Sequence, residues 1–272
     1  MNYIVTEKGV EFECSCFDLA LTLDCGQAFR WARVPSRQGC AFEGYVKDTF
    51  LHISQDGSRF LLRDKGEKEF LELWKDYFDL DTDQEPILRQ LCEDKYLRMA
   101  IEKYRGIRIL RQDREEALIS FVISQNNNIP RIKGIIGRMT ELFGCFPTLE
   151  MLSEMNEEDL APLRAGFRAK YLIDCGRRVT DGEVSLDRAA EMPLEEAKAE
   201  LKKIKGVGEK VASCVLLFGF HRLDAYPVDV WMKRVNEKLY PDGLPACMKG
   251  YEGIAQQYLF HGIRNGLYDA LT

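Results

Sequence analysis

The sequence lacks any apolar stretch long enough to cross a membrane. Its longest strongly apolar run, residues 211–220, is interrupted by Ser213, whereas a membrane-spanning helix needs about 20 apolar residues. The first fourteen residues also lack the charged-then-apolar layout of a secretion signal. We therefore expect a soluble intracellular protein that has no membrane partner.

The sequence also lacks the closely spaced cysteines and histidines of a metal site. Its nine cysteines are an odd number, which favours reduced thiols over a disulfide framework. Cys14 and Cys16 are too close together for zinc spacing, the three histidines are scattered, and only Cys247 follows Cys214. We expect no bound metal.

Positive charge is scarce, because the formal net charge is −6. This argues against a protein that coats nucleic acid, since Lys and Arg supply most of the non-specific affinity for phosphate. Residues 101–140 nevertheless hold eight basic and four acidic side chains. This segment is either a basic face that binds DNA at a defined site or an ordinary solvated helix surface.

The pattern of apolar residues predicts an α+β fold. Residues 40–46 and 49–54 alternate between apolar and polar, which indicates an antiparallel sheet within about the first 64 residues. Helical spacing follows from residue 65, without an internal repeat or a low-complexity linker. We expect an N-terminal β-rich domain with trailing helices at 1–112 and a helical domain at 113–272, with helices near 67–78, 84–93, 113–125, 129–143, 168–180, 194–204, 209–220, 230–239 and 249–264.

A glycine hairpin joins two of these helices. Gly206-Val207-Gly208 follows the helix at 194–204 and precedes the helix at 209–220. The unpaired N–H groups of such a turn and of the next helix's first turn suit a phosphate. A plain helix C-cap is the alternative interpretation.

A lysine and an aspartate around this hairpin indicate covalent chemistry. Lys210 lies in the first helical turn after the glycines, and a neutral amine is a nucleophile. The helix and the loop after it are long enough to bring Asp229 back beside Lys210. The alternatives are a solvated surface lysine for Lys210 and a helix N-cap for Asp229, and the cap is compatible with a catalytic role.

These motifs resemble the helix-hairpin-helix DNA glycosylases, and four further segments resemble the 8-oxoguanine DNA glycosylases among them. The segments are CGQAFRW at 25–31, SQNNNIPR at 124–131, GFRAKY at 166–171 and GIAQQYLF at 253–260. The resemblance covers nearly the whole chain. Some helix-hairpin-helix glycosylases hold an iron–sulfur cluster on four C-terminal cysteines, which this chain lacks there.

For the DNA, the resemblance implies that the duplex is opened and the damaged base is flipped out. It implies that Asn126 fills the vacated space and that Arg131 and Arg168 contact the orphaned cytosine. It also implies that Phe167 is the wedge, where the family usually has Tyr. From the residues alone, Asn126, Asn127 and Asn128 could equally be helix-capping residues.

For the base, the resemblance implies that the Gly26 carbonyl accepts the N7 proton that distinguishes 8-oxoguanine from guanine. It further implies that Cys214 and Phe260 enclose the base and that Gln256 bonds to its pairing edge. The alternatives are a turn glycine for Gly26 and simple core packing for Cys214 and Phe260. The chain departs from the family at Trp231, where relatives often carry a phosphate-contacting histidine.

The function implied is excision of 8-oxoguanine opposite cytosine. Lys210 attacks C1′, Asp229 stabilises positive charge on the sugar, and the resulting Schiff base allows β-elimination without metal or cofactor. We expect a monomer that acts on double-stranded DNA containing 8-oxoguanine, in a bacterial or archaeal cytoplasm. Two alternatives stay open: a monofunctional glycosylase of other damaged bases, and a non-catalytic helix-hairpin-helix DNA-binding module.

Overall fold

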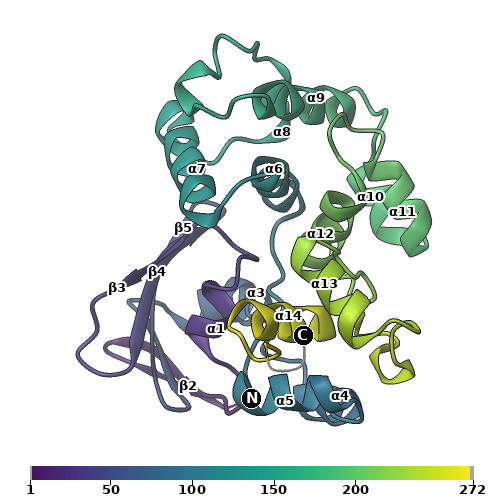
Figure 1. The fold of residues 1–272 in the computed structure, drawn as a ribbon. Coiled ribbons are helices and arrows are strands. Elements are labelled where there is room, and N and C mark those ends of the chain that lie inside the picture. Colours follow the sequence, from purple (N-terminus) through teal and green to yellow (C-terminus); the bar gives the residue numbers. More distant parts are fainter. Residues whose placement is uncertain (1, 270–272) are drawn as a thin grey trace.

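Six strands near the start of the chain form one antiparallel sheet. The computed structural model of the protein describes residues 2–269, and it places the strands in the order β1-β2-β6-β5-β4-β3 (Figure 1). Strands β3, β4, β5 and β6 lie side by side in chain order. Strand β2 pairs with β6 on one side and with β1, the edge strand, on the other. The strands are β1 Tyr3–Thr6, β2 Gly9–Glu13, β3 Trp31–Val34, β4 Cys40–Val46, β5 Thr49–Asp56 and β6 Arg59–Arg63.

Aromatic side chains fill the space between this sheet and the helical segment that follows it. That segment comprises α2 (Glu67–Glu69), a π-helical turn η1 (Phe70–Trp74) and α3 (Lys75–Tyr77). Trp31 on β3 meets Trp74 edge-on at 6.4 Å between ring centroids, and its indole N–H donates to the Tyr77 hydroxyl at 2.8 Å. The expected sheet and the helix near 67–78 are both present.

The rest of the described chain is mainly helical. Within residues 2–269, none of the helices combines the length and apolar character that a membrane span requires. The remaining elements are α1 Leu19–Leu23, α4 Gln84–Leu91, α5 Lys95–Lys103, α6 Arg114–Ser124, α7 Ile129–Phe143, α8 Leu149–Ser153, η2 Ala161–Leu163, α9 Arg168–Thr180, α10 Leu186–Glu191, α11 Leu194–Leu201, α12 Glu209–Gly219, α13 Val230–Leu239, η3 Ala246–Met248 and α14 Glu252–Arg264.

Helix boundaries follow the expected local signals. Asp113 caps the N-terminus of α6 by accepting from two backbone N–H groups, and α7 ends at Gly144 with a φ of 74°. Sequence analysis missed α5, although the Asp94 cap and its apolar spacing were present. It also missed α1, α8 and α10, which have only five or six residues each and are too short to show a helical period.

Helix α6 lies at the centre of the helical region (Figure 1). Every residue from Ala117 to Ile123 is buried, so this helix is apolar on all sides, as expected for a fully enclosed helix. Helix α12 packs beside it, and Phe121 and Phe218 stack at 5.2 Å between ring centroids. Lys210 at the start of α12 also lies close to Ser124 at the end of α6, so the two helices run side by side in opposite directions.

One hydrophobic core lies against the sheet and a second fills the helical region, and the segment after α5 joins them. Gln27, which is completely buried, donates to the carbonyl oxygens of Thr22 and Arg108 and accepts from the Leu110 N–H. Helices α4 and α5 pack in the helical core although they precede residue 113. The division into domains at 1–112 and 113–272 stays a prediction.

We predict that Gln27→Met lowers the free energy of unfolding by about 2–6 kcal/mol. Methionine keeps the length of the side chain but leaves the Arg108 carbonyl and the Leu110 N–H unpaired, at about 1–3 kcal/mol for each buried group. Urea unfolding monitored by circular dichroism measures the change. Gln38→Met, at an exposed loop position, is the matched control. Equal unfolding midpoints for the two variants would contradict this role for Gln27.

Candidate active site

The glycine hairpin packs directly on α9. Gly206 has a φ of 85°, and a Cβ there would lie 2.5 Å from Tyr171 Cδ2, so any larger residue must displace the tyrosine ring. Gly208 is the N-cap of α12 and supplies no side-chain hydrogen bond to its first turn. Val207 is buried beneath the turn. The first backbone N–H groups of α12 are therefore available to an anion.

The expected wedge residue lies beside the hairpin. Phe167 precedes α9 and is 43% exposed, a high value for a phenylalanine. Its ring meets the ring of Tyr171 edge-on at 5.6 Å, and Tyr171 in turn contacts Gly206. The hairpin and the exposed ring thus belong to one continuous surface, whose use as a DNA contact stays a prediction.

Lys210 points towards the end of α6. Its Nζ donates to Ser124 Oγ at 3.5 Å and lies 5.6 Å from the centroid of the Phe121 ring. The side chain is half-buried, unlike a freely solvated surface lysine. Sequence analysis did not assign Ser124 or Phe121 to the site, although Ser124 begins the SQNNNIPR segment.

Asp229 is both a helix cap and a neighbour of the lysine. Its Oδ1 accepts from the N–H groups of Trp231 and Met232 at 2.9 Å each, which caps α13. Asp229 and Lys210 line the same two cavities. The chain path predicted from the lengths of α12 and its following loop is therefore confirmed.

A small inner chamber lies next to these two residues. It measures about 60 Å³ and adjoins an outer cavity of about 390 Å³. Four residues expected to hold the base all line the inner chamber: Gly26, Cys214, Gln256 and Phe260. Sequence analysis did not assign five others to it: Cys25, Phe121, Phe218, Pro227 and Gln257.

The two thiols of the chamber are kept neutral. Burial raises the pKa of Cys214, and this effect outweighs the opposing one of the Lys210 ammonium, while the Asp229 carboxylate raises it further. Burial also raises the pKa of Cys25 to about 11. Since a thiolate is the nucleophilic form of cysteine, the two neutral thiols form walls of the chamber and are not its nucleophile.

Gly26 takes a conformation that favours glycine. Its φ is 90°, and a Cβ would lie 3.3 Å from Ile129 Cδ1 on α7. Gly26 lines both the chamber and the outer cavity, so its backbone is accessible to a ligand on that side. Hydrogen bonding by its carbonyl oxygen to a base stays a prediction.

The three asparagines have different structural roles. Asn128 caps α7 by accepting from the Arg131 N–H at 3.0 Å, and Asn127 donates to the Ile123 carbonyl at 3.1 Å. Asn126 has a φ of 46°, a left-handed conformation that is uncommon outside glycine. Capping therefore accounts for Asn127 and Asn128 but not for the left-handed backbone at Asn126, whose contact with DNA stays a prediction.

Arg168 stabilises the asparagine loop by hydrogen bonds to its backbone. Its guanidinium donates to the carbonyl oxygens of Gln125 and Asn126, and only 1% of the residue is exposed. Burial, followed by the nearby charge of Arg131, lowers the pKa of Arg168. Arg131 is exposed and available for contact, whereas Arg168 is occupied by backbone carbonyls. Contact of either arginine with a cytosine stays a prediction.

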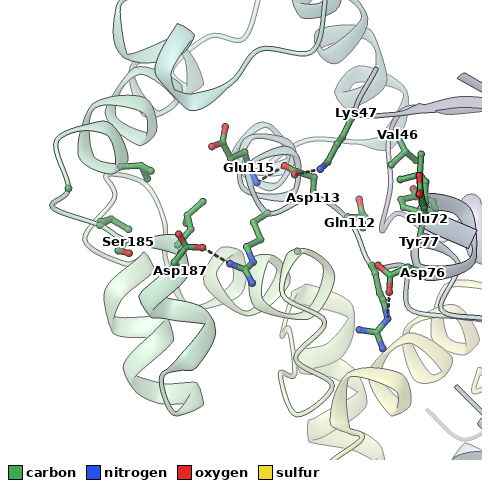
Figure 2. Close-up of a pocket in the computed structure, with 18 residues that line it drawn as sticks. Val46, Lys47, Glu72, Asp76, Tyr77, Gln112, Asp113, Glu115, Ser185 and Asp187 are labelled. Carbon is green, nitrogen blue, oxygen red and sulfur yellow. Dashed lines mark hydrogen bonds and ion pairs between the residues drawn. The ribbon is translucent and has the colours of Figure 1, made fainter. Parts of the chain in front are cut away.

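A larger cleft of about 680 Å³ lies at the other end of α6 (Figure 2). Figure 2 shows Asp113 and Glu115, at the start of α6, among the labelled side chains that line it. Six of the eight charged side chains that line it are paired with one another: Lys47 with Asp113, Arg114 with Asp187, and Arg111 with Asp76. The smaller chamber, which both Lys210 and Asp229 line, is therefore the candidate active site.

Two family descriptions match consecutive parts of the chain. Residues 10–118 match the N-terminal domain of 8-oxoguanine DNA glycosylase, and residues 119–243 match the HhH-GPD superfamily of base excision DNA repair proteins. The fold and the lysine–aspartate chamber thus define a helix-hairpin-helix DNA repair protein.

Relatives identify the family within that class. N-glycosylase/DNA lyase OGG1 of Arabidopsis thaliana is 31% identical, over 82% of this chain and 67% of its own. A solved Clostridium acetobutylicum 8-oxoguanine glycosylase/lyase, in complex with double-stranded DNA containing cytosine opposite 8-oxoguanine, has a TM-score of 0.88 and 34% identity, covering 98% of this chain and 99% of its own. A structure of MBOgg1 with a low-affinity DNA ligand is 36% identical, with the same TM-score, over 97% of this chain and 99% of that one. The chain belongs to the 8-oxoguanine DNA glycosylase family.

We predict that Asp229→Asn keeps the stability of the protein and that Asp229→Ala loses about 1 kcal/mol. Asparagine caps a helix as well as aspartate does, whereas alanine cannot accept from the Trp231 and Met232 N–H groups. Thermal unfolding of both variants measures this difference. Equal losses in the two variants would show that the charge of Asp229, and not its cap, stabilises the fold.

Proposed function

We propose that this chain removes 8-oxoguanine opposite cytosine from double-stranded DNA and then cuts the strand at the abasic sugar. It is a bifunctional DNA N-glycosylase and lyase. The observation that carries this proposal is the convergence of Lys210 and Asp229 on one chamber with the four expected base-binding residues. A non-catalytic DNA-binding hairpin has no need of a nucleophile and a carboxylate beside such a chamber.

The glycosylase step breaks the bond between the base and the sugar. The neutral amine of Lys210 attacks C1′, and the bonding electrons leave with the base, which takes up a proton. Asp229 stabilises the positive charge that develops at C1′ and the ring oxygen. Because Asp229 Oδ1 is already held by two backbone N–H groups, the carboxylate is fixed in position before the substrate arrives.

The lyase step follows from the covalent intermediate. Opening of the sugar ring and loss of the lysine proton give a Schiff base between Nζ and C1′. The iminium makes the C2′ proton acidic, and its removal expels the 3′ phosphate by β-elimination. Neither step requires a metal or a cofactor.

The proposed contacts with DNA lie on the surface formed by the glycine hairpin, Phe167 and the asparagine loop. We assign Asn126 to the space left by the flipped base and Phe167 to the wedge, because one has an unusual backbone conformation and the other an exposed ring. Arg131 and Arg168 are assigned to the cytosine. The turn formed by Gly206, Val207 and Gly208 is assigned to a backbone phosphate, which its first-turn N–H groups suit.

The proposal extends to the oligomeric state of the enzyme and to its location in the cell. The lysine and aspartate of the site come from one chain, so we propose a monomer. A DNA repair enzyme acts where the cell's DNA lies, and we propose a bacterial or archaeal cytoplasm. Catalogued relatives come from an archaeon, Methanothermobacter thermautotrophicus, as well as from plant and yeast.

We predict that Lys210→Gln retains lesion binding but slows excision by at least about a thousandfold, because it removes the nucleophile. Borohydride trapping on a labelled duplex with 8-oxoguanine opposite cytosine gives a covalent adduct with the wild type and none with the variant. An undamaged duplex is the substrate control, and Lys95→Gln, also in the first turn of a helix, is the protein control. Base release without an adduct in the wild type would instead establish a monofunctional enzyme in which water attacks.

We predict that Asp229→Asn slows base release by about a hundredfold or more while the helix cap is kept, since an amide cannot neutralise the charge on the sugar. Single-turnover release of labelled 8-oxoguanine measures this rate. Full activity in this variant would leave Asp229 with only its structural role.

A further inference from the structure

Two adjacent glutamines on α14 face the chamber as a bonded pair. Gln256 and Gln257 both line it and both are at most 5% exposed. Gln257 Nε2 donates to Gln256 Oε1 at 2.7 Å. In this arrangement Gln257 acts as the donor and Gln256 as the acceptor, so the Gln256 Nε2 donor is left for another partner.

Each member of this pair keeps one polar atom unused. Within residues 2–269, Gln257 Oε1 is buried without a hydrogen-bond partner, and Gln256 Nε2 has none among the described contacts. An unpaired buried acceptor is destabilising unless a ligand supplies a donor. The pair thus leaves one free donor, Gln256 Nε2, on a residue that lines the chamber, whereas Gln257 Oε1 is enclosed within the fold.

The arrangement matches one kind of purine. A guanine-type base carries an acceptor, the carbonyl oxygen, at position 6 and a donor, the N–H, at position 1. An adenine-type base carries the reverse, an amine at position 6 and an acceptor at position 1. A single free glutamine satisfies either base, because its amide can turn end over end. Gln256 cannot turn in this way while Gln257 donates to its Oε1.

We propose that Gln257 determines the purine specificity of the chamber by holding the Gln256 amide in one orientation. The Gln256 Nε2 donor then faces a carbonyl at position 6, so that 8-oxoguanine is accepted and 8-oxoadenine is rejected. This inference rests on the proposed function and names the feature of the base that the same site reads.

The test compares excision of two oxidised purines. Single-turnover rates are measured for 8-oxoguanine and for 8-oxoadenine, each opposite cytosine, and both are normalised to strand cleavage at an abasic site by the same protein. We expect the wild type to favour 8-oxoguanine by at least about tenfold, the cost of one unpaired buried group. Gln257→Met, which keeps the length but cannot donate, lowers that ratio by about tenfold or more.

Two further variants separate specificity from stability. Gln257→Asn keeps an amide but is one carbon shorter, so it withdraws from Gln256 Oε1 and lowers the ratio in the same direction. Tyr258 lies on the same helix as the two glutamines but does not line the chamber. Tyr258→Phe removes the hydrogen bond that the Tyr258 hydroxyl accepts from the Gly106 N–H, and we expect it to retain the wild-type ratio. A structural role for Gln257 would instead lower all three rates together.

Opposite outcomes are distinguishable. An unchanged ratio in active Gln257→Met and Gln257→Asn overturns this inference alone. A wild type that excises both bases equally overturns it even when the variants fail to fold. A wild type that cleaves abasic DNA but does not release 8-oxoguanine overturns the proposed function, and this inference with it.

Discussion

The packing of α12 on α6 is the contact on which the site depends. The two helices pack antiparallel, with Gly219 at the end of α12 against Ala117 near the start of α6, so the first turn of α12 lies beside the last turn of α6. Lys210 is thereby brought to Ser124 and to the asparagine loop that follows it. The amine assigned to catalysis and the loop assigned to the DNA gap are therefore held next to each other by the same pair of helices.

Local signals in the sequence were sufficient to predict that Lys210 and Asp229 lie at one site. The glycines at 206 and 208, the lysine two residues after the second of them, and the capping geometry at Asp229 all depend on neighbours in the chain. Residues whose role depends on packing between distant helices were not predictable in this way. Phe121 and Gln257 look like ordinary core residues until α6, α12 and α14 are brought together around the chamber.

Arg168 illustrates the limit of transferring roles by resemblance. Its position in the GFRAKY segment was expected, but nothing in the sequence indicated that its guanidinium would lie under the carbonyls of Gln125 and Asn126. Such an arrangement supports the left-handed backbone at Asn126, whose conformation would otherwise cost about 1–3 kcal/mol. In the structure, the arginine stabilises the loop that we assign to contact with DNA.

The buried thiols of the chamber have a consequence for the conditions in which the enzyme works. Oxidised guanine arises where reactive oxygen species are present, and the form of cysteine that peroxides attack is the exposed thiolate. Cys25 and Cys214 are both buried, with pKa values raised by burial, so they are poor targets for such oxidants. These two thiols of the chamber are therefore expected to react more slowly with peroxides than an exposed cysteine does.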